Sequence, residues 1–334
     1  MEYSVIIRTL GTAKEKYQQT LDSIAYQTIK AKEIIVVLPF GYDLPKERLG
    51  YEKFIFSSKG MVSQRITGLQ ACSTELILAL DDDVYFEPSF AEKIIKTLID
   101  TNADFVSPLV KTTNSHSKLE RINYISHLKQ KILNIKDWLL GIAYKAPLKS
   151  NFIIEINNSG GFTINSSPTK SEYSLNQTGH GTCLFGKTQK IKEIHFEDEL
   201  WLEDTKYALP EDMVMFYKLY LYGNKIAMNF DVKFIHLDAG SSLMNENKKI
   251  NNIFASARNG YIFWYKFIYQ IRKKKVVAIL AMSRRIFFTR FFSFIKGIIK
   301  CNFKYFRTYI KGYIDGYKYV KSSQYKPLNI KHKS

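Results

Sequence analysis

The chain has 334 residues and a formal net charge of +18. With 46% hydrophobic residues and only 8 prolines it can bury a large core, which excludes a fibrous or wholly disordered protein. The charge is unevenly distributed, because residues 248–334 hold 21 of the 49 Lys and Arg residues and a single acid, whereas residues 1–247 hold 28 bases and 30 acids. We therefore expect two parts with different roles.

Cysteine usage and the longest apolar runs indicate the compartment. Cys72, Cys183 and Cys301 lack the spacing of a zinc site or a disulfide framework, which favours a reducing compartment. The N-terminal run MEYSVIIRTLG places an acid before a very short apolar stretch, unlike a signal peptide. Near the C-terminus, the apolar run 276–282 is soon followed by two arginines and is far shorter than the ~20 residues that span a bilayer. We expect a cytoplasmic protein.

The first 110 residues alternate between short β-branched runs and apolar residues at helical spacing. A strand, a helix and a strand are predicted over residues 3–7, 14–27 and 33–38, which is a βαβ unit with parallel strands. The pattern continues with a helix, a strand, a helix and a strand over residues 63–72, 75–80, 90–100 and 105–110. It predicts a doubly wound α/β arrangement, whose ligand lies at the carboxyl ends of the strands.

The middle of the chain is less regular. Polar and glycine-rich runs such as NNSGG interrupt residues 111–177, where only a helix over residues 121–140 is predicted. Order returns at residues 179–185, followed by a helix over 211–222 and a strand over 233–237. A polar run at 241–249 marks the predicted boundary between a first domain, 1–245, and a basic tail, 246–334. The first domain divides into halves of about 1–110 and 111–245.

Three consecutive acids, Asp81, Asp82 and Asp83, follow the strand that ends the run LILAL. Side chains alternate along a strand, so Asp81 and Asp83 are expected to share a side. Adjacent carboxylates repel one another, and a divalent cation is a common compensation, since Mg²⁺ or Mn²⁺ is held by one or two carboxylates and completed by substrate phosphates. An acidic turn or a cap for the next helix is the alternative. The position at a strand's carboxyl end favours a metal and phosphate site.

Five segments, in this order and spacing over residues 1–240, resemble a glycosyltransferase of family 2 with the GT-A fold, of the bacterial surface-polysaccharide type. They are SVIIRT, LDSIAYQT, KEIIVV, QRITGLQACSTELILALDDDV and PEDMVMFYKLYLYGNKI. The resemblance implies an α/β fold with a Rossmann-like mixed sheet flanked by helices, to which this chain adds a basic amphipathic helical region. It also implies that a hexose is transferred, with inversion, from a nucleoside-diphosphate sugar.

The resemblance places the donor site on residues of the first half. It implies that Thr9, in the loop after the first strand, lies beside the nucleotide, and that Asp81, with its neighbour Asp82, contributes to donor binding near the ribose or nucleobase. Arg65 falls close to the base or diphosphate, the alternative being a charge on a helix surface. In place of the acid that usually follows the second strand this chain has Leu38. The nucleotide, UDP, GDP or dTDP, is therefore left open.

The resemblance also implies a metal site. Asp83 is the expected ligand of Mn²⁺ or Mg²⁺ in the DxD motif. His236 follows a strand near the end of the first domain, where related enzymes use a histidine to complete the metal site or to contact the diphosphate. A histidine at a strand end that serves only the fold is the alternative.

Inverting transfer needs a carboxylate that takes the proton from the acceptor hydroxyl. Two acidic pairs are candidates, Glu203–Asp204 and Glu211–Asp212. The second pair begins a predicted helix and has the spacing of the family's ED motif, so we predict Asp212 as the general base and Glu211 as the residue that orients the site. The alternative is that both acids complement the dipole at a helix N-terminus. Trp201 is interpreted either as an acceptor-stacking residue or as part of the core.

The basic tail contains a predicted amphipathic helix over residues 285–300. Eight apolar residues fall on one side of its wheel, namely Phe287, Phe288, Phe291, Phe292, Phe294, Ile295, Ile298 and Ile299. Four bases fall on the other side, namely Arg285, Arg290, Lys296 and Lys300. Such a helix is typical of an interfacial membrane helix, and residues 303–319 have a similar character. Helices that cover the core, or stacking on single-stranded nucleic acid, are the alternatives.

Together the patterns predict a metal-dependent hexosyltransferase, peripheral on the inner face of the cell membrane. Its expected partners are a nucleoside-diphosphate sugar, a glycan acceptor linked to a lipid and an anionic membrane surface, with no nucleic acid. A nucleotidyltransferase is the first rival, but its glycine-rich GxGTR-type loop is poorly matched by LGTAKEK after the first strand. A noncatalytic membrane or nucleic-acid adaptor is the second rival, and the complete set of Asp81, Asp83 and Asp212 opposes it.

Overall fold

The computed structural model of the chain describes residues 1–112, 127–167, 172–237 and 246–329. The chain forms two compact units, each assembled from separate segments. Unit 1 comprises Met1–Leu119, Lys170–Trp201 and Glu211–Ala239. Unit 2 comprises Glu120–Thr169, Leu202–Pro210 and Gly240–Ser334. The boundary predicted at residue 245 stays a prediction, and unit 2 joins the basic tail to a segment from the middle of the chain.

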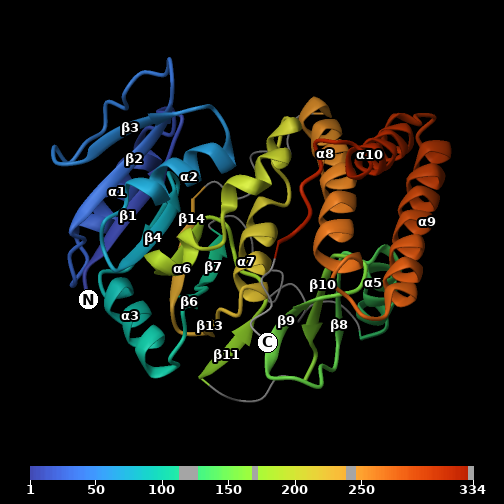
Figure 1. Cartoon of the computed structure of the whole chain (residues 1–334), viewed down its shortest axis with the longest axis horizontal. Helices are drawn as coiled ribbons and strands as arrows, with labels where there is room; N and C mark the ends of the chain where they lie inside the picture. Colours follow the sequence, from blue (N-terminus) through green and yellow to red (C-terminus); the bar gives the residue numbers. More distant parts are fainter. Residues whose placement is uncertain (113–126, 168–171, 238–245, 330–334) are drawn as a thin grey trace. The chain divides into compact units, whose positions relative to one another are not determined.

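Unit 1 is built on a mixed sheet whose strands run in the order β3-β2-β1-β4-β12-β6-β13-β11 (Figure 1). The strands β1 to β4 are parallel, and β12 is antiparallel to both β4 and β6. Their bounds are β1 Tyr3–Arg8, β2 Glu33–Pro39, β3 Lys53–Ser57, β4 Leu76–Asp81, β6 Phe105–Val106, β11 Tyr173–Asn176, β12 Cys183–Lys187 and β13 Ile226–Asn229. Because both faces of the parallel strands are covered, β1, β2 and β4 are nearly continuous apolar runs.

Helices cover this sheet on both faces. They are α1 Glu15–Ala25, α2 Met61–Ala71, α3 Phe90–Asp100, α6 Thr188–Lys192 and α7 Glu211–Leu221. Alternate residues of β1 divide between the faces, since Tyr3 and Val5 join a core with Tyr17 of α1 and Ile94 of α3, while α2 packs against β1, β2 and β3. The predicted strands and helices of the first 100 residues are present, with ends that differ by no more than two residues.

A second sheet of unit 1 corrects one prediction. The strand predicted over residues 105–110 is two strands, because β6 ends at Val106 and β7, Leu109–Thr112, begins a separate sheet. Pro108 lies between them and has no N–H to donate to a ladder. The separate sheet runs β5-β14-β7, with β5 Val84–Phe86 and β14 Lys233–His236. In this sheet the end of β14 lies beside the residues that follow β4.

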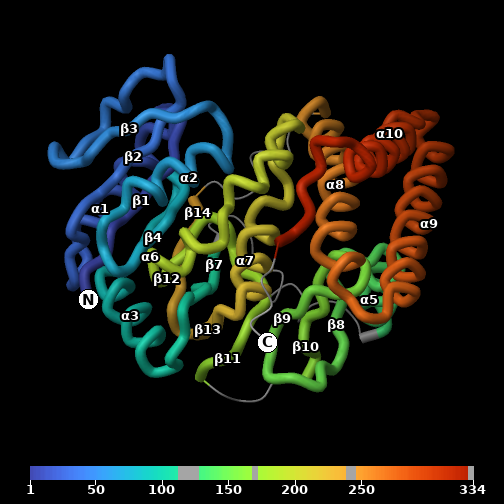
Figure 2. Tube along the Cα trace, viewed as in Figure 1, coloured from blue at the N-terminus to red at the C-terminus, as the bar shows by residue number. Residues whose placement is uncertain are grey.

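Unit 2 combines helices with three neighbouring strands in the order β9-β10-β8 (Figure 2). Its elements are α5 His127–Leu140, β8 Ala143–Ala146, β9 Phe152–Ile156, β10 Phe162–Asn165, α8 Glu246–Trp264, η4 Tyr265–Tyr269, α9 Lys275–Ile299 and α10 Lys304–Val320. The chain passes from unit 1 to unit 2 within η2, Phe196–Asp204. Residues 121–126 of the helix predicted at 121–140, and residues 241–245 of the predicted boundary, lie outside the described residues.

The helices α8 and α10 pack along each other, and α9 packs against both α10 and α5. The predicted amphipathic helix is part of α9, which begins ten residues earlier than expected, at Lys275. Its buried side consists mainly of small residues, namely Ala278, Met282, Thr289, Ser293 and Gly297. Within the described part of the chain, no helix has the length and apolar content to cross a membrane.

Candidate active site

The adjacent parallel strands β1 and β4 end at the same edge of the sheet, with Arg8 and Asp81 in register. The Arg8 Nε lies 2.5 Å from the Asp81 Oδ1. Burial alone would raise the pKa of Asp81, but the Arg8 guanidinium, with weaker contributions from Arg65 and His236, holds that pKa below its ordinary value. Arg8 therefore neutralises part of the negative charge of the three consecutive acids. The sequence analysis did not identify Arg8 in this role.

Asp82 faces the loop that follows β1. The Thr9 hydroxyl donates a hydrogen bond to Asp82 and accepts one from the Gly11 N–H at 2.9 Å. Burial, with the nearby negative charges of Asp81 and Asp83, raises the pKa of Asp82 to about 6. The hydrogen bond from Thr9 acts in the opposite direction and lowers this pKa. The structure thus brings together two residues that were predicted to bind the donor, Thr9 and Asp82.

Asp83 meets His236 across the second sheet. The His236 Nε2 lies 3.1 Å from the Asp83 Oδ2, and the Leu237 N–H donates to the Asp83 carbonyl at 2.8 Å. The three acids therefore have three different partners, because β4 ends at Asp81 and strand alternation does not extend to the residues beyond it.

A carboxylate oxygen is an ordinary ligand of Mn²⁺, and a neutral imidazole nitrogen is the commonest side-chain ligand of metals in general. The described residues contain no group of three or more His, Cys, Asp or Glu side chains placed to hold a metal ion. Asp83 and His236 therefore fit a site in which the protein supplies two ligands and the oxygens of a bound diphosphate supply others, as is usual for Mg²⁺ at phosphate sites.

Glu211, the first residue of α7, is held by two arginines. The Arg65 Nε lies 2.5 Å from Glu211 Oε1, and the Arg8 Nη1 lies 3.5 Å from Oε2. Arg65 also donates to the Gly181 carbonyl at 3.0 Å and is only 3% exposed, so the interpretation as a surface charge is wrong. Its predicted contact with the donor stays a prediction. In this structure it fixes Glu211.

Asp212 follows Glu211 in the first turn of α7 and lies beside the loop that precedes β12. Its Oδ1 accepts a hydrogen bond from the Met213 N–H at 2.8 Å. Burial, and then the charge of Glu211, raises the pKa of Asp212 above its ordinary value. The backbone of Gly181 lies so close that a Cβ at that position would be 2.5 Å from the Asp212 Cβ. Asp212 is therefore a partly buried carboxylate with a high proton affinity, which suits a general base.

His180 interacts electrostatically with the carboxylates of Asp81 and Asp83 and with that of Asp212. Its ring centroid is 5.9 Å from that of His236, and its Nδ1 is 2.7 Å from the Thr182 hydroxyl. Burial lowers the pKa of His180, whereas the carboxylates of Asp212, Asp81 and Asp83 act to raise it. The His180 side chain therefore interacts electrostatically with both Asp212 and the Asp83–His236 pair.

The loop after β1 is fixed by a residue that sequence reasoning did not identify. The Gln64 side-chain amide donates to the carbonyls of both Thr9 and Val37 at 2.9 Å. It thereby joins the ends of the neighbouring strands β1 and β2 from helix α2. A glutamine one residue before Arg65 was the only signal, and its partners are set by the packing of α2 on the sheet.

Two other acidic or aromatic candidates have structural roles. Trp201 is buried and its indole donates to Glu199 at 2.7 Å, and Glu199 in turn accepts from Lys218 at 2.7 Å. Trp201 therefore belongs to the core of unit 1, as one of the two sequence interpretations held. Asp204, from the alternative acidic pair, accepts a hydrogen bond from Arg258 at 2.7 Å within unit 2.

Comparison with known proteins gives two positive findings. Residues 4–165, a little under half of the chain, match the family model described as Glycosyl transferase family 2. Among solved structures, the chain is similar to a crystal structure of GalNAc-T7 with UDP, GalNAc and Mn²⁺, at 13% identity and a TM-score of 0.52. The match covers 80% of this chain and 50% of that one, so the chain spans about half the length of that structure. None of the curated proteins matches significantly.

The structural likeness, at this low identity, concerns the fold alone. The protein has the GT-A fold, an α/β architecture with a mixed Rossmann-like sheet flanked by helices, so the predicted fold class is confirmed. The family match and the fold together support a glycosyltransferase of family 2.

Proposed function

We propose that the protein is an inverting, metal-dependent glycosyltransferase that acts in bacterial surface-polysaccharide synthesis. It moves a hexose from a UDP-, GDP- or dTDP-sugar to a hydroxyl of a glycan that is linked to a lipid. The observation that carries this proposal is that His180 lies next to His236 of the Asp83–His236 pair and interacts electrostatically with the high-pKa carboxylate of Asp212. The family match over residues 4–165 supports the same reaction class.

The donor half of the reaction is assigned to the edge formed by β1 and β4. Thr9, Asp81 and Asp82 lie where ligands of open α/β sheets bind, at the carboxyl ends of the strands. Asp83 and His236 would hold Mn²⁺ or Mg²⁺, which stabilises the negative charge that develops on the departing diphosphate. The GalNAc-T7 structure contains UDP and Mn²⁺, which is consistent with this assignment.

The acceptor half is assigned to Asp212. Its carboxylate takes the proton of the acceptor hydroxyl while that oxygen bonds to the anomeric carbon and the bond to the diphosphate breaks. A carboxylate whose pKa is raised by burial and by Glu211 is a better proton acceptor than an exposed one. Arg65 and Arg8 hold Glu211, so its negative charge stays beside Asp212.

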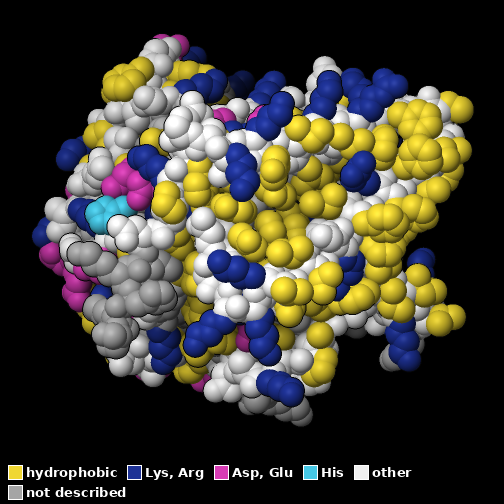
Figure 3. Space-filling model, turned by 45° about the vertical axis from the view of Figure 1, so that its right-hand side comes forward, with side chains coloured by type: hydrophobic (Ala, Val, Ile, Leu, Met, Phe, Trp, Pro, Cys, Tyr) yellow, Lys and Arg dark blue, Asp and Glu magenta, His cyan; other side chains and the backbone are white. Residues whose placement is uncertain are grey.

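Unit 2 is assigned to a membrane surface on the cytoplasmic side. The face formed by α9 and α5 is apolar and exposed, with Phe287 61% exposed and Ile299 76% exposed. Figure 3 shows hydrophobic side chains gathered over the helices of unit 2, with Lys and Arg side chains among them. An apolar face rimmed by bases suits an anionic bilayer, to which each base near the surface contributes about 1 kcal/mol.

A donor screen with a matched pair of variants tests the proposed reaction. UDP-, GDP- and dTDP-sugars are offered with Mn²⁺, and slow hydrolysis of one of them identifies the donor. Asp212→Asn should abolish sugar transfer, by about 10²-fold or more, and leave donor affinity near that of the wild type. Asp231→Asn, an exposed aspartate of unit 1, is the control and should change neither. Full transfer by Asp212→Asn, or loss with Asp204→Asn instead, would show that the wrong carboxylate has been chosen.

A further inference from the structure

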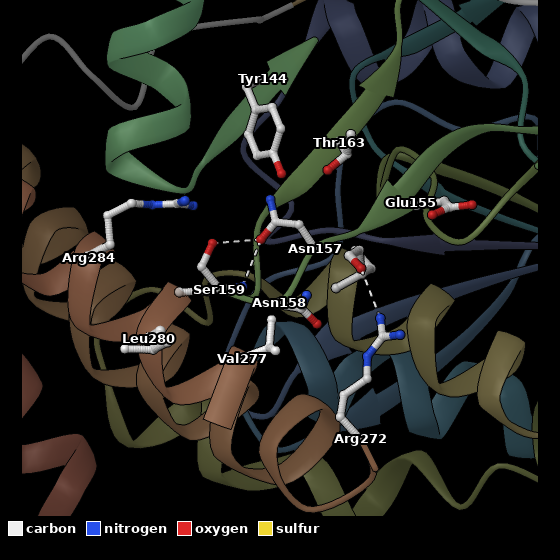
Figure 4. A pocket seen from close by; sticks show the side chains of 12 residues that line it. Tyr144, Glu155, Asn157, Asn158, Ser159, Thr163, Arg272, Val277, Leu280 and Arg284 are labelled. Carbon is white, nitrogen blue, oxygen red and sulfur yellow. Dashed lines mark hydrogen bonds between the residues drawn. The ribbon is translucent and has the colours of Figure 1, made fainter. Parts of the chain in front are cut away.

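A pocket of about 520 Å³ lies wholly within unit 2, between the β8–β10 sheet and the first turns of α9. Figure 4 shows Asn157 at its centre, Arg284 on one side and Glu155 on the other. The glycine-rich run NNSGG, which had no role in the predicted function, supplies the loop at its base. None of the residues that line the pocket is among those proposed for sugar transfer, all of which belong to unit 1.

The pocket contains a buried hydrogen-bond donor whose orientation is fixed. The Asn157 Oδ1 accepts from the N–H of Ser159 at 2.9 Å, from the Ser159 hydroxyl at 2.6 Å and from the N–H of Gly161 at 3.2 Å. Two backbone N–H groups, which can only donate, prevent the amide from being reversed, so its Nδ2 is directed into the pocket (Figure 4). Asn157 is 9% exposed and this Nδ2 has no hydrogen-bond partner. Leaving a buried donor unpaired is costly, and a bound acceptor removes that cost.

A cation with a second unpaired donor lies nearby. The Arg284 Cζ is 3.9 Å from the centroid of the Trp138 ring of α5, and its Nε, also buried, has no hydrogen-bond partner. Arg272, on the opposite wall, donates to the Ile156 carbonyl at 3.2 Å. The carboxylate of Glu155 accepts a hydrogen bond from the Ser150 hydroxyl. The two buried atoms without a partner, Asn157 Nδ2 and Arg284 Nε, are both hydrogen-bond donors. The pocket also contains two positively charged arginines and one negatively charged glutamate. The complementary ligand is therefore an anion rich in acceptor oxygens.

The pocket opens beside an apolar and basic surface. Leu280 lines the pocket and is 65% exposed, and Val276, one turn earlier on α9, is 68% exposed. Three consecutive exposed lysines, Lys273, Lys274 and Lys275, precede these residues. A ligand that satisfies this arrangement has an anionic head and a hydrocarbon tail, because a free anion would leave the exposed aliphatic side chains uncovered.

We propose that this pocket binds the phosphate group of an anionic membrane phospholipid, with the hydrocarbon chains along the exposed side of α9. Asn157 and Arg284 donate to the phosphate oxygens, and Arg272 adds charge from the other wall. The inference rests on the proposed membrane attachment of unit 2 and is independent of the proposed sugar transfer. It adds a saturable site for one lipid to the general attraction of a basic surface.

Calorimetry on the full chain with dihexanoyl phosphatidylglycerol, a soluble short-chain lipid, tests the site. The wild type should bind one lipid per chain. Arg284→Met and Asn157→Asp should each weaken binding about tenfold or more, since hydrogen bonds to charged groups contribute at least that factor. Arg290→Met removes the same charge from an exposed position of α9 and should change the affinity by no more than about twofold. Inorganic phosphate and uncharged dihexanoylglycerol should each bind far more weakly than the phospholipid.

The inference would be overturned if Arg284→Met, Asn157→Asp and Arg290→Met weakened lipid binding equally, or if the wild type showed no saturable binding. Tight binding of inorganic phosphate without gain from the lipid would leave a phosphate site and contradict the lipid. Arg284→Lys, which keeps the charge over Trp138 but not the Nε donor, gives an intermediate affinity if the pocket is correct and guards against misfolding of Arg284→Met. Vesicle binding and donor hydrolysis by the same proteins separate a failure of this site from a failure of membrane attachment or of sugar transfer.

Discussion

Gly181 lies against Asp212 with no room for a side chain, because a Cβ at Gly181 would be 2.5 Å from the Asp212 Cβ and 3.4 Å from its Oδ2. Gly181→Ala must therefore displace the proposed base. We expect the transfer rate to fall by about 10²-fold, since misplacing a catalytic group by about 1 Å has an effect of that size. Donor affinity should stay close to that of the wild type, because the displaced group acts on the acceptor.

Transfer kinetics and donor binding, measured on the same preparation, check this prediction. Gly41→Ala is a suitable control, since a Cβ there meets nothing within 4 Å, although its positive φ adds some backbone strain. A normal transfer rate in Gly181→Ala would mean that Asp212 can move without loss and would contradict its role as a positioned base.

The proposed metal site makes a prediction about the donor. Asp83→Asn should weaken binding of the nucleotide-sugar in Mn²⁺, because one of the two protein ligands loses its charge, while unfolding is unchanged. Isothermal titration with and without Mn²⁺ measures the effect, which should disappear when the metal is omitted. Wild-type transfer that persists in EDTA would contradict metal dependence.

The central strands could be predicted because their burial is reflected in their apolar composition. Strands β1, β2 and β4 are buried on both faces and appear as nearly continuous apolar runs, and the amphipathic spacing of α3 is equally clear. The helix α8 was missed, since its first half is rich in asparagine and lysine and carries weak apolar periodicity. Its packing against α10, which follows it by tens of residues, is a tertiary effect that no local window contains.

The candidate site was predicted in the same uneven way. Family spacing pointed to Asp83, Asp212 and His236, but an arginine after an apolar strand has the appearance of an ordinary solvent-exposed charge. Arg8 meets Asp81 across 73 residues of sequence because β1 and β4 pair in a definite register. Such a partner becomes visible only when the strand order is known.

The raised pKa of Asp212 predicts the pH dependence of transfer. A carboxyl group that still holds its proton cannot act as a base, so the transfer rate should fall as the pH drops through the raised pKa, above the ordinary value of about 3.9 for aspartate. Glu211→Gln removes the negative neighbour and frees the charge of Arg65, which lowers the pKa of Asp212. The acid limb of the rate profile should therefore move to lower pH in this variant, and a shift to higher pH would contradict the assignment.

A buried ion pair in unit 1 predicts a large effect on stability. Lys218 and Glu199 are almost fully buried, with Nζ and Oε1 2.7 Å apart. Lys218→Met leaves the carboxylate of Glu199 buried without its cation, and should lower the free energy of unfolding by about 3–5 kcal/mol. Urea unfolding measures this. Lys190→Met, which breaks the exposed pair with Glu193, should cost less than about 1 kcal/mol, and equal losses in the two variants would contradict the argument.

Vesicle binding should depend on the exposed bases of α9. Arg285 is unsuitable for this test, since it donates to the Ser159 carbonyl at 2.9 Å and its replacement would disturb unit 2 itself. Reversal of Arg290, Lys296 and Lys300 to Glu should weaken binding to anionic vesicles by about 10²-fold or more, because each base near an anionic surface contributes about 1 kcal/mol. Binding by the wild type should also weaken in high salt, where exposed charges are screened within about 10 Å.

Reversal of three exposed lysines of unit 1, Lys46, Lys53 and Lys93, is the matched control, because it changes the net charge by the same amount. If attachment depends on the α9 face, this control should retain most of the vesicle binding, and donor hydrolysis should be normal in both triple variants. Equal loss in the two would mean that net charge alone drives the association. Salt-insensitive binding to neutral vesicles would show that the aromatic side chains suffice without the bases, and tight binding of single-stranded RNA with no vesicle binding would assign the tail to nucleic acid.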